Sequence, residues 1–279
     1  MSESSSGRTF DTAGAPATRG RWRRLARITF LCLIPVAVLA GFFLSRSVMQ
    51  AQESARRSNC SCGLKQFGLA LHNYHETYGT FPPAFVLGPD GQPWHSWRVL
   101  ILPYLECDPL YQEYRFAEPW DGPNNRKLLS RMPTIFACPS RPYTAKADLL
   151  ATMSFGLLAC DAHPLSARDG NTSYAAVLGQ DCAFRGTVAV TIKDITDGTS
   201  NTALIGESNR TKIPWTKPED IDIAFHPKLG DPDGFSSYHD QGCHFLRGDG
   251  TVKFLRYDLP KATVDAVFTR NGGETVNID

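Results

Sequence analysis

The sequence has no excess of charge of either sign: its 29 Lys and Arg residues balance 28 Asp and Glu residues and leave a net charge of +1. Proteins that hold nucleic acid through its phosphates carry a basic face. Residues 1–27 contain six arginines and two acidic residues, so the remainder of the chain is slightly acidic. The composition therefore predicts no nucleic-acid partner.

Motifs of the common enzyme classes are also absent. The sequence contains no G-x-S-x-G, no phosphate-binding P-loop, no dinucleotide-binding glycine pattern and no H-E-x-x-H. We therefore expect a protein that is not an enzyme and has no catalytic, cofactor-binding or metal-binding residues. The alternative is an envelope hydrolase centred on His239 and Asp249. Folding can add His244 and Glu207 to such an acid–base or metal cluster.

Long hydrophobic runs are lacking, with one exception at residues 28–45. This run has eighteen residues without a charge, and five arginines lie among the nine residues before it. With a short extension it reaches the roughly 20 residues that a helix needs to cross a bilayer. The run predicts a transmembrane helix over residues 28–46, with the lipid bilayer as its partner. A removable signal peptide is the alternative.

The arginines before this run also predict the topology. By the positive-inside rule the N-terminus is cytoplasmic and the head is exported, so the predicted localisation is a single-pass membrane protein. Residues 1–27 form a basic cytoplasmic tail, which we expect to be disordered because it has few large apolar residues. Residues 81–279 are numerous enough to form one globular head with its own core.

Residues 47–80 are predicted to continue the helix beyond the membrane. They contain no proline, and Leu64, Phe67 and Leu71 recur at the spacing of one helix face. Gly79 supplies a helix stop.

The head is predicted to be mainly a sheet, because short apolar runs alternate with turn signals after residue 81. The predicted strands are 99–105, 173–178, 187–192, 202–205, 243–248 and 251–256. Asp249 and Gly250 are typical of a two-residue type I′ hairpin turn, which places Phe245 opposite Phe254. A helix followed by a mainly antiparallel sheet indicates the α+β class.

Several motifs carry a resemblance to a known family. They are RRSNCSCGLKQFGLALHNYHETYGTFPP at 56–83, EPWDGPNNRKLL at 118–129, FACPS at 136–140, DGTSNT at 197–202, and His239 followed after nine residues by Asp249 and Gly250. Together they resemble a family of pilin-like, prepilin-type proteins of unknown function that is expanded in planctomycetes. One departure is the missing prepilin cleavage motif, from which we predict that the N-terminus is retained.

The resemblance implies a pilin-like fold, with a long N-terminal helix whose first half lies in the membrane and whose second half packs on the sheet. It implies a structural or assembly role in the cell envelope or in a pseudopilin-type apparatus, with pilin-like or secretion-apparatus proteins as partners. It also implies a disulfide between Cys60 and Cys138, which occupy the family's recurrent cysteine positions. An exported head would permit this bond.

Three further groups of residues suggest ligands, although we favour a structural interpretation of each. His72 and His75 can bind zinc or border the contact of helix and sheet. The polar segments 194–201 and 231–240 can bind calcium or hydrogen-bond their own turns. Four tryptophans can form a binding surface or anchor the core, namely Trp94, Trp97, Trp120 and Trp215. With such sites the head would be a membrane-tethered binding module for a glycan, peptide or calcium-dependent partner, which is the alternative function.

Overall fold

The computed structural model describes residues 18–141, 170–208, 212–226 and 228–274, without the side chains of residues 18–38 and 40. The chain divides into two units, Met1–Gln52 and Glu53–Asp279. Helix α1, Thr18–Tyr78, belongs in part to each. It begins inside the segment predicted to be a disordered tail, where Arg, Leu and Ala after Gly20 are good helix formers. Residues 1–17 of that tail lie outside the described residues.

The segment predicted to cross the membrane, residues 28–46, is helical and lies in α1. In the described part of the chain, no helix combines the length and the apolar character that a membrane span requires. The side chains of residues 28–38 and 40 are outside that part. The transmembrane helix and its topology therefore stay predictions.

The end of α1 is part of the core of the second unit. Leu64, Phe67 and Leu71 are fully buried, at the spacing expected for one helix face. The helix stops at Tyr78, and Gly79 follows with a positive φ of 77° while its N–H bonds the carbonyl of His75. The predicted end of the helix is thus confirmed.

The main sheet of the head has five strands in the order β5-β3-β4-β6-β7. The strands are β3 (Tyr174–Leu178), β4 (Ala203–Glu207), β5 (Ile221–Asp222), β6 (Gly242–Arg247) and β7 (Val252–Arg256). All neighbours are antiparallel except β3 and β5, which are parallel. A separate two-stranded sheet joins β1 (Phe85–Leu87) to β2 (Pro93–Ser96). The α+β class is confirmed.

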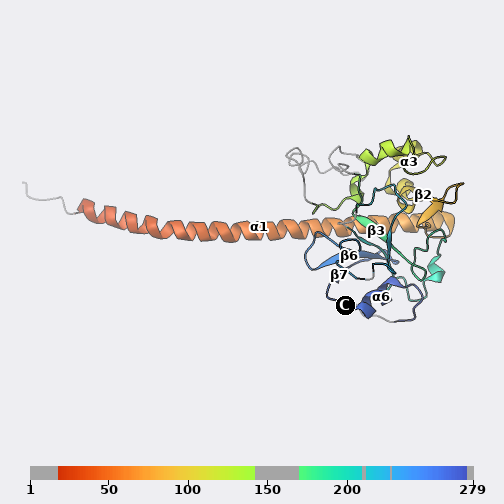
Figure 1. Ribbon diagram of the computed structural model, residues 1–279. Helices are drawn as coiled ribbons and strands as arrows, with labels where there is room; N and C mark the ends of the chain where they lie inside the picture. Colours follow the sequence, from red (N-terminus) through yellow and green to blue (C-terminus); the bar gives the residue numbers. More distant parts are fainter. Residues whose placement is uncertain (1–17, 142–169, 209–211, 227, 275–279) are drawn as a thin grey trace, which may run out of the picture. The chain divides into compact units, whose positions relative to one another are not determined.

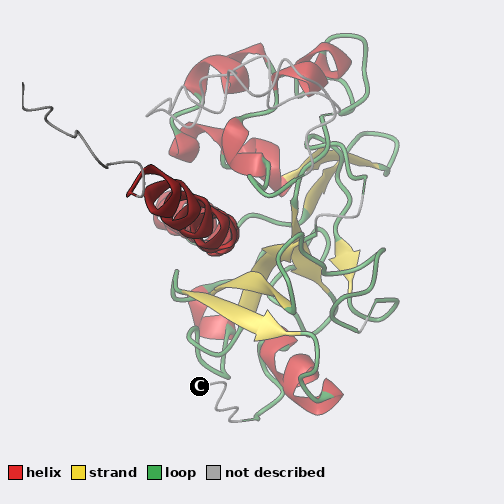
Figure 2. Cartoon of the chain, turned by 90° about the vertical axis from the view of Figure 1, so that its left-hand side faces the viewer, coloured by secondary structure: helices red, strands yellow, loops and turns green. Residues whose placement is uncertain are grey.

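Short helices accompany the sheet. They are α2 (Trp97–Leu100), η1 (Leu102–Leu105), α3 (Asp108–Glu113), α4 (Asn125–Leu128), η2 (Leu129–Arg131), η3 (Thr134–Phe136), η4 (Ile192–Asp194) and α6 (Lys261–Phe268). In Figure 1, α3 lies above the sheet and α6 below it, and the turned view of Figure 2 keeps helices at both of these ends.

Alternation along the strands creates two hydrophobic clusters, one on each face of the sheet. In β3, Tyr174 and Ala176 join the cluster that contains the end of α1, whereas Ala175 and Val177 join the cluster that contains α6. Both faces of the sheet are therefore covered, which is why β3 is buried at four successive positions.

Two predicted strands are wrong. Residues 99–105 form parts of α2 and η1, because Ser96 caps the first of these helices by accepting a hydrogen bond from the N–H of Arg98 and Pro103 suits the start of the second. Residues 187–192 form no strand in the described chain. There Thr191 and Asp194 make a capping box that starts η4.

The hairpin of β6 and β7 is confirmed, but its predicted register is wrong by one residue. Phe245 pairs with Lys253, and Phe254 pairs with His244. The N–H of Arg247 bonds Thr251, and the N–H of Gly250 bonds Arg247, so the loop has three residues instead of two. Gly250 has a φ of 81° and Asp249 keeps a negative φ, as in a type I turn with a bulge.

A buried ion pair joins α2 to the sheet. The guanidinium of Arg98 lies 2.6 Å from the carboxylate of Asp220, and both side chains are almost completely buried. Arg98 also donates to Tyr174 and Glu219 carbonyls and to the hydroxyl of Ser96. Asp220 accepts further hydrogen bonds from the Trp97 indole and the Ala176 N–H. Every polar atom of the pair therefore has a partner.

Candidate functional site

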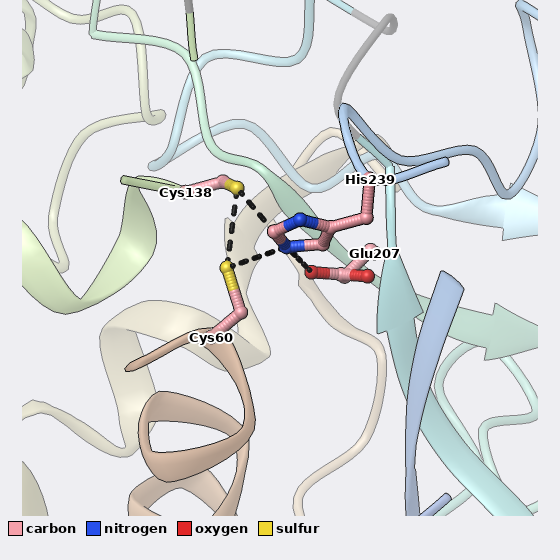
Figure 3. A group of neighbouring side chains, drawn as sticks. All are labelled: Cys60, Cys138, Glu207 and His239. Carbon is pink, nitrogen blue, oxygen red and sulfur yellow. Dashed lines mark hydrogen bonds and ion pairs between the residues drawn. The ribbon is translucent and has the colours of Figure 1, made fainter. Parts of the chain in front are cut away.

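Four buried side chains from distant parts of the head meet between α1 and the sheet. They are Cys60, Cys138, Glu207 and His239, and their donor atoms all lie within 4.8 Å of one another. Figure 3 shows both sulfurs and the Glu207 carboxylate directed at the His239 ring. We refer to these residues as the four-residue cluster.

His239 is at the centre of the cluster. Its Nε2 atom lies 3.3 Å from the sulfur of Cys60, 3.9 Å from the sulfur of Cys138 and 3.4 Å from Oε1 of Glu207. The two sulfurs are 3.1 Å apart. One ring nitrogen thus faces two thiol groups and a carboxylate.

Local structure positions each member of the cluster. Cys60 lies one helical turn before Leu64, on the buried face of α1. Cys138 follows η3, and its N–H bonds the hydroxyl of Ser173. Glu207 is the last residue of β4. His239 precedes β6, and its N–H bonds the hydroxyl of Ser237.

Other polar groups hold the imidazole and the carboxylate in place. Nδ1 of His239 lies 2.6 Å from Oε1 of Glu53, in the part of α1 that belongs to the head. Oε2 of Glu207 accepts a hydrogen bond from the N–H of His244 at 2.7 Å and lies 3.1 Å from Nδ1 of the same residue. Oε1 of Glu207 makes an ion pair with Nε2 of His239 at 3.4 Å, but no hydrogen bond among the described residues. This atom is buried and faces the cluster.

Burial and mutual contacts shift the pKa values of the cluster. Burial opposes a charged His239, but its contacts with Cys138, Glu207 and Glu53 outweigh this and raise its pKa to about 10. Burial likewise opposes ionisation of Glu207, yet its bonds with His239 and His244 lower its pKa to about 2. The imidazolium and the carboxylate are therefore both charged at neutral pH.

The two thiols are shifted in opposite directions. The hydrogen bond with Cys60 lowers the pKa of Cys138 to about 6, and the contact with His239 adds to this effect. The same hydrogen bond raises the pKa of Cys60, as does burial. Ionisation is thus favoured at Cys138 and opposed at Cys60. Chemically, such a pair can close a disulfide or bind a metal ion together with His239 and Glu207.

Only three of the five site residues named from the sequence lie together in the structure. Cys60 and Cys138 lie side by side as the resemblance implies, and the structure holds them as two free thiols rather than a disulfide. His239 is in the cluster. Asp249 and Gly250, the rest of the family motif, form the hairpin turn instead, where the Asp249 carboxylate accepts from the N–H and hydroxyl of Thr251.

The hypothetical acid–base cluster is assembled without Asp249. His239, His244 and Glu207 do meet, but the two cysteines and Glu53 complete the group. Glu53 was not identified from the sequence, because this residue precedes all of the family motifs. Glu53 lies seven residues before Cys60, which is two turns along the same helix face. This spacing could have indicated that the two side chains face the same site.

The other ligand candidates have structural roles. The rings of His72 and His75 both pack against Phe81. The carboxylate of Asp197 accepts backbone N–H groups of Gly272 and Gly273, and Asp231 accepts from its own turn. Within the described ranges, the four-residue cluster is the one group suited to a metal ion.

The tryptophans divide between core and partly exposed positions. Trp97 and Trp215 are completely buried, so they anchor the core. Trp94 and Trp120 are half-buried.

The sequence matches the protein family described as "Protein of unknown function (DUF1559)" at residues 49–229 and 226–261, which together make up well over half of the chain. The matched residues include Glu53 and all of the four-residue cluster. No curated protein and no solved structure matches the sequence. The resemblance is thus confirmed as far as a family of unknown function. Its pilin-like character and its motif stay predictions.

Proposed function

The chain belongs to this family of unknown function, and we propose that it is a single-pass, membrane-anchored structural or assembly protein of the cell envelope with a pilin-like layout. In this proposal α1 carries an anchor at its N-terminal end and a docked head at its C-terminal end. The protein would act within the envelope or in a pseudopilin-type apparatus, alongside proteins of similar layout.

The observation that carries the proposal is the contrast between two parts of α1. Large apolar side chains are exposed in the first unit, namely Leu39, Phe42, Phe43, Leu44, Val48 and Met49. In the second unit the apolar side chains Leu64, Phe67 and Leu71 are buried. A concentration of exposed large apolar residues indicates a surface that lipid or another protein covers. The first four of these residues lie within the uncharged run 28–45, which favours lipid.

Two features support an exported, non-enzymatic head. Cys107 is disulfide-bonded, and such bonds form and persist in oxidising compartments. The His239 side chain has no exposed surface, whereas a general acid or base must come within hydrogen-bond reach of its substrate. The buried cluster therefore suits a structural role.

Membrane extraction of the full chain tests the anchor. The native protein should stay in the membrane pellet after an alkaline carbonate wash. Replacing Phe42 and Phe43 by Asp should release a large part of it, since charges within a membrane segment are costly. Leu69→Asp is the matched control, because Leu69 is an exposed apolar residue of the same helix within the head. Release of the native protein by carbonate would contradict the anchor.

The assembly role requires a separate measurement. Chemical cross-linking in intact cells should yield oligomers of the native chain, and the double Asp variant should lose them. A native chain that stays monomeric at the membrane, with an unaltered envelope after deletion of its gene, would instead favour the binding-module function.

A further inference from the structure

We propose that Cys60, Cys138, Glu207 and His239 are the four ligands of a structural zinc(II) site that fastens α1 to the head. This site is independent of the proposed membrane anchor, because all of its residues belong to the unit Glu53–Asp279. Its ligands come from α1, the segment after η3, the end of β4 and the segment before β6.

The spacing of the donor atoms is close to that of a tetrahedral zinc site. Zinc lies about 2.3 Å from sulfur and about 2.0 to 2.2 Å from nitrogen or oxygen, so a tetrahedron separates two sulfurs by about 3.8 Å, sulfur from nitrogen by about 3.6 Å, and nitrogen from oxygen by about 3.4 Å. Here the two sulfurs are 3.1 Å apart. Nε2 of His239 lies 3.3 Å and 3.9 Å from them, and 3.4 Å from Oε1 of Glu207. Small side-chain movements suffice to admit the ion.

The Glu207 carboxylate points independently to a ligand. The Glu207 side chain is completely buried, and its Oε1 atom makes an ion pair with Nε2 of His239 at 3.4 Å but no hydrogen bond in the described chain. A buried carboxylate oxygen without a hydrogen bond is poorly compensated for the loss of its water. In the buried Arg98–Asp220 pair, by contrast, every polar atom of the two charged groups has a hydrogen-bond partner. A metal ion at the cluster would complete the coordination of Oε1.

The remaining atoms of the histidine and the carboxylate are held as in known metal sites. A ligating histidine typically bonds a carboxylate through its other nitrogen, which orients the ring. Nδ1 of His239 meets Glu53 in this way and leaves Nε2 toward the two sulfurs. The N–H of His244 fixes Oε2 of Glu207 and leaves Oε1 toward the same point.

The donor set selects zinc among the common metal ions. Two sulfurs, one imidazole nitrogen and one carboxylate oxygen suit a borderline-soft ion with tetrahedral geometry. Calcium and magnesium require a shell of oxygens. Four protein ligands leave no position for a substrate, so the site is structural. Zinc binding requires both thiols and Nε2 of His239 to be deprotonated.

A disulfide between Cys60 and Cys138 is the competing outcome. It would bring the sulfurs to about 2.05 Å and use both of them. Oε1 of Glu207 and Nε2 of His239 would then keep only the ion pair that they make with each other at 3.4 Å. A zinc site uses all four side chains as ligands, whereas the disulfide uses two of them.

Metal analysis of the full chain tests the site. The protein is extracted in detergent, purified without chelator or added metal, and analysed by elemental mass spectrometry, which should find about one zinc per chain. Cys138→Ser and Glu207→Gln should each lower the zinc content severalfold. Cys62→Ser is the matched control, because Cys62 is an exposed cysteine two residues from Cys60 on the same helix, and it should retain the metal.

A second measurement separates loss of the site from loss of the fold. Cobalt(II) added to the metal-free native chain should give the visible spectrum of a tetrahedral thiolate site, and Glu207→Gln should alter that spectrum while circular dichroism stays native. The proposal is overturned if the native chain lacks zinc and peptide mapping finds Cys60 linked to Cys138. It is also overturned if Cys62→Ser loses as much metal as Cys138→Ser.

Discussion

The head contains two buried groups of charged side chains, the Arg98–Asp220 pair and the four-residue cluster, and they differ in how their polar atoms are paired. Both join a helix to the sheet, and both are almost closed to solvent. In the first, all donors of the guanidinium and both carboxylate oxygens have protein partners. In the second, Oε1 of Glu207 has an ion pair with His239 but no hydrogen bond, and two thiols lie beside it. The first group is thus complete without a ligand, whereas the second has donor atoms that a metal ion can use.

The largest predicted loss of stability concerns the Arg98–Asp220 pair. Arg98→Ala leaves Asp220 buried beside Trp97 without its cation, and breaking such a pair costs about 3–5 kcal/mol. Urea unfolding of the full chain should show this loss, in the presence and absence of zinc alike. Arg126→Ala, at an exposed arginine of α4, should change the stability by less than about 0.5 kcal/mol. Equal stabilities of the two variants would refute a structural role for the pair.

Removal of the metal should lower the stability of the protein only while the four-residue cluster is intact. With free zinc at about a hundred times its dissociation constant, binding stabilises the native chain by about 2.7 kcal/mol. A chelator should therefore lower the melting temperature of the native protein, and added zinc should restore it. Cys138→Ser should not respond to either addition. A chelator effect of the same size on both proteins would mean that the metal acts elsewhere.

A smaller effect is expected at the hairpin turn, which belongs to neither charged group. Gly250 has a φ of 81°, a conformation that a β-branched residue tolerates poorly. Gly250→Val should destabilise the head by more than about 1 kcal/mol in thermal melting. Gly41→Val serves as the control, because no atom lies within 4 Å of an added Cβ at that helical glycine. If both substitutions leave melting unaltered, the turn does not require a glycine.

The smallest effect is expected at Cys62. Its side chain is exposed and lies two residues from Cys60, on a different face of α1. Cys62→Ser should change the free energy of unfolding by less than about 0.5 kcal/mol, while Cys60→Ser should cost clearly more. The difference between the two melting curves measures how much the buried thiol of Cys60 contributes to stability. A larger loss for Cys62→Ser would place the important thiol on the exposed face.

Local patterns were sufficient for several elements of the fold. The end of α1 follows from apolar residues at helical spacing and from Gly79, and β3, β4, β6 and β7 follow from short apolar runs between turns. These signals lie within a few neighbouring residues. Residues 99–105 were misassigned because apolar side chains suit a buried strand and a buried short helix equally, and here the cap at Ser96 favoured the helix.

The hairpin shows where a local signal stops being sufficient. Asp249-Gly250 predicts a tight turn correctly, but a two-residue and a three-residue loop both fit this dipeptide. The register depends on packing beyond the turn. The hairpin lies close against α1: a Cβ added at Gly68 would come within 2.9 Å of Leu246 and 3.2 Å of the Gly250 Cα. Leu246 and Val252 therefore pair on the face toward the helix.

The amino-acid sequence was sufficient to predict the end of α1, four strands of the main sheet, the α+β class and the membership in a family of unknown function, because these depend on periodicity and motifs within short segments. The four-residue cluster depends on contacts between residues separated by up to 179 positions. A histidine, a glutamate and two cysteines are separately compatible with many roles. Their meeting around one ring nitrogen results from the packing of the end of α1 in the same core as the sheet. Burial removes the water that would otherwise hydrogen-bond Oε1 of Glu207.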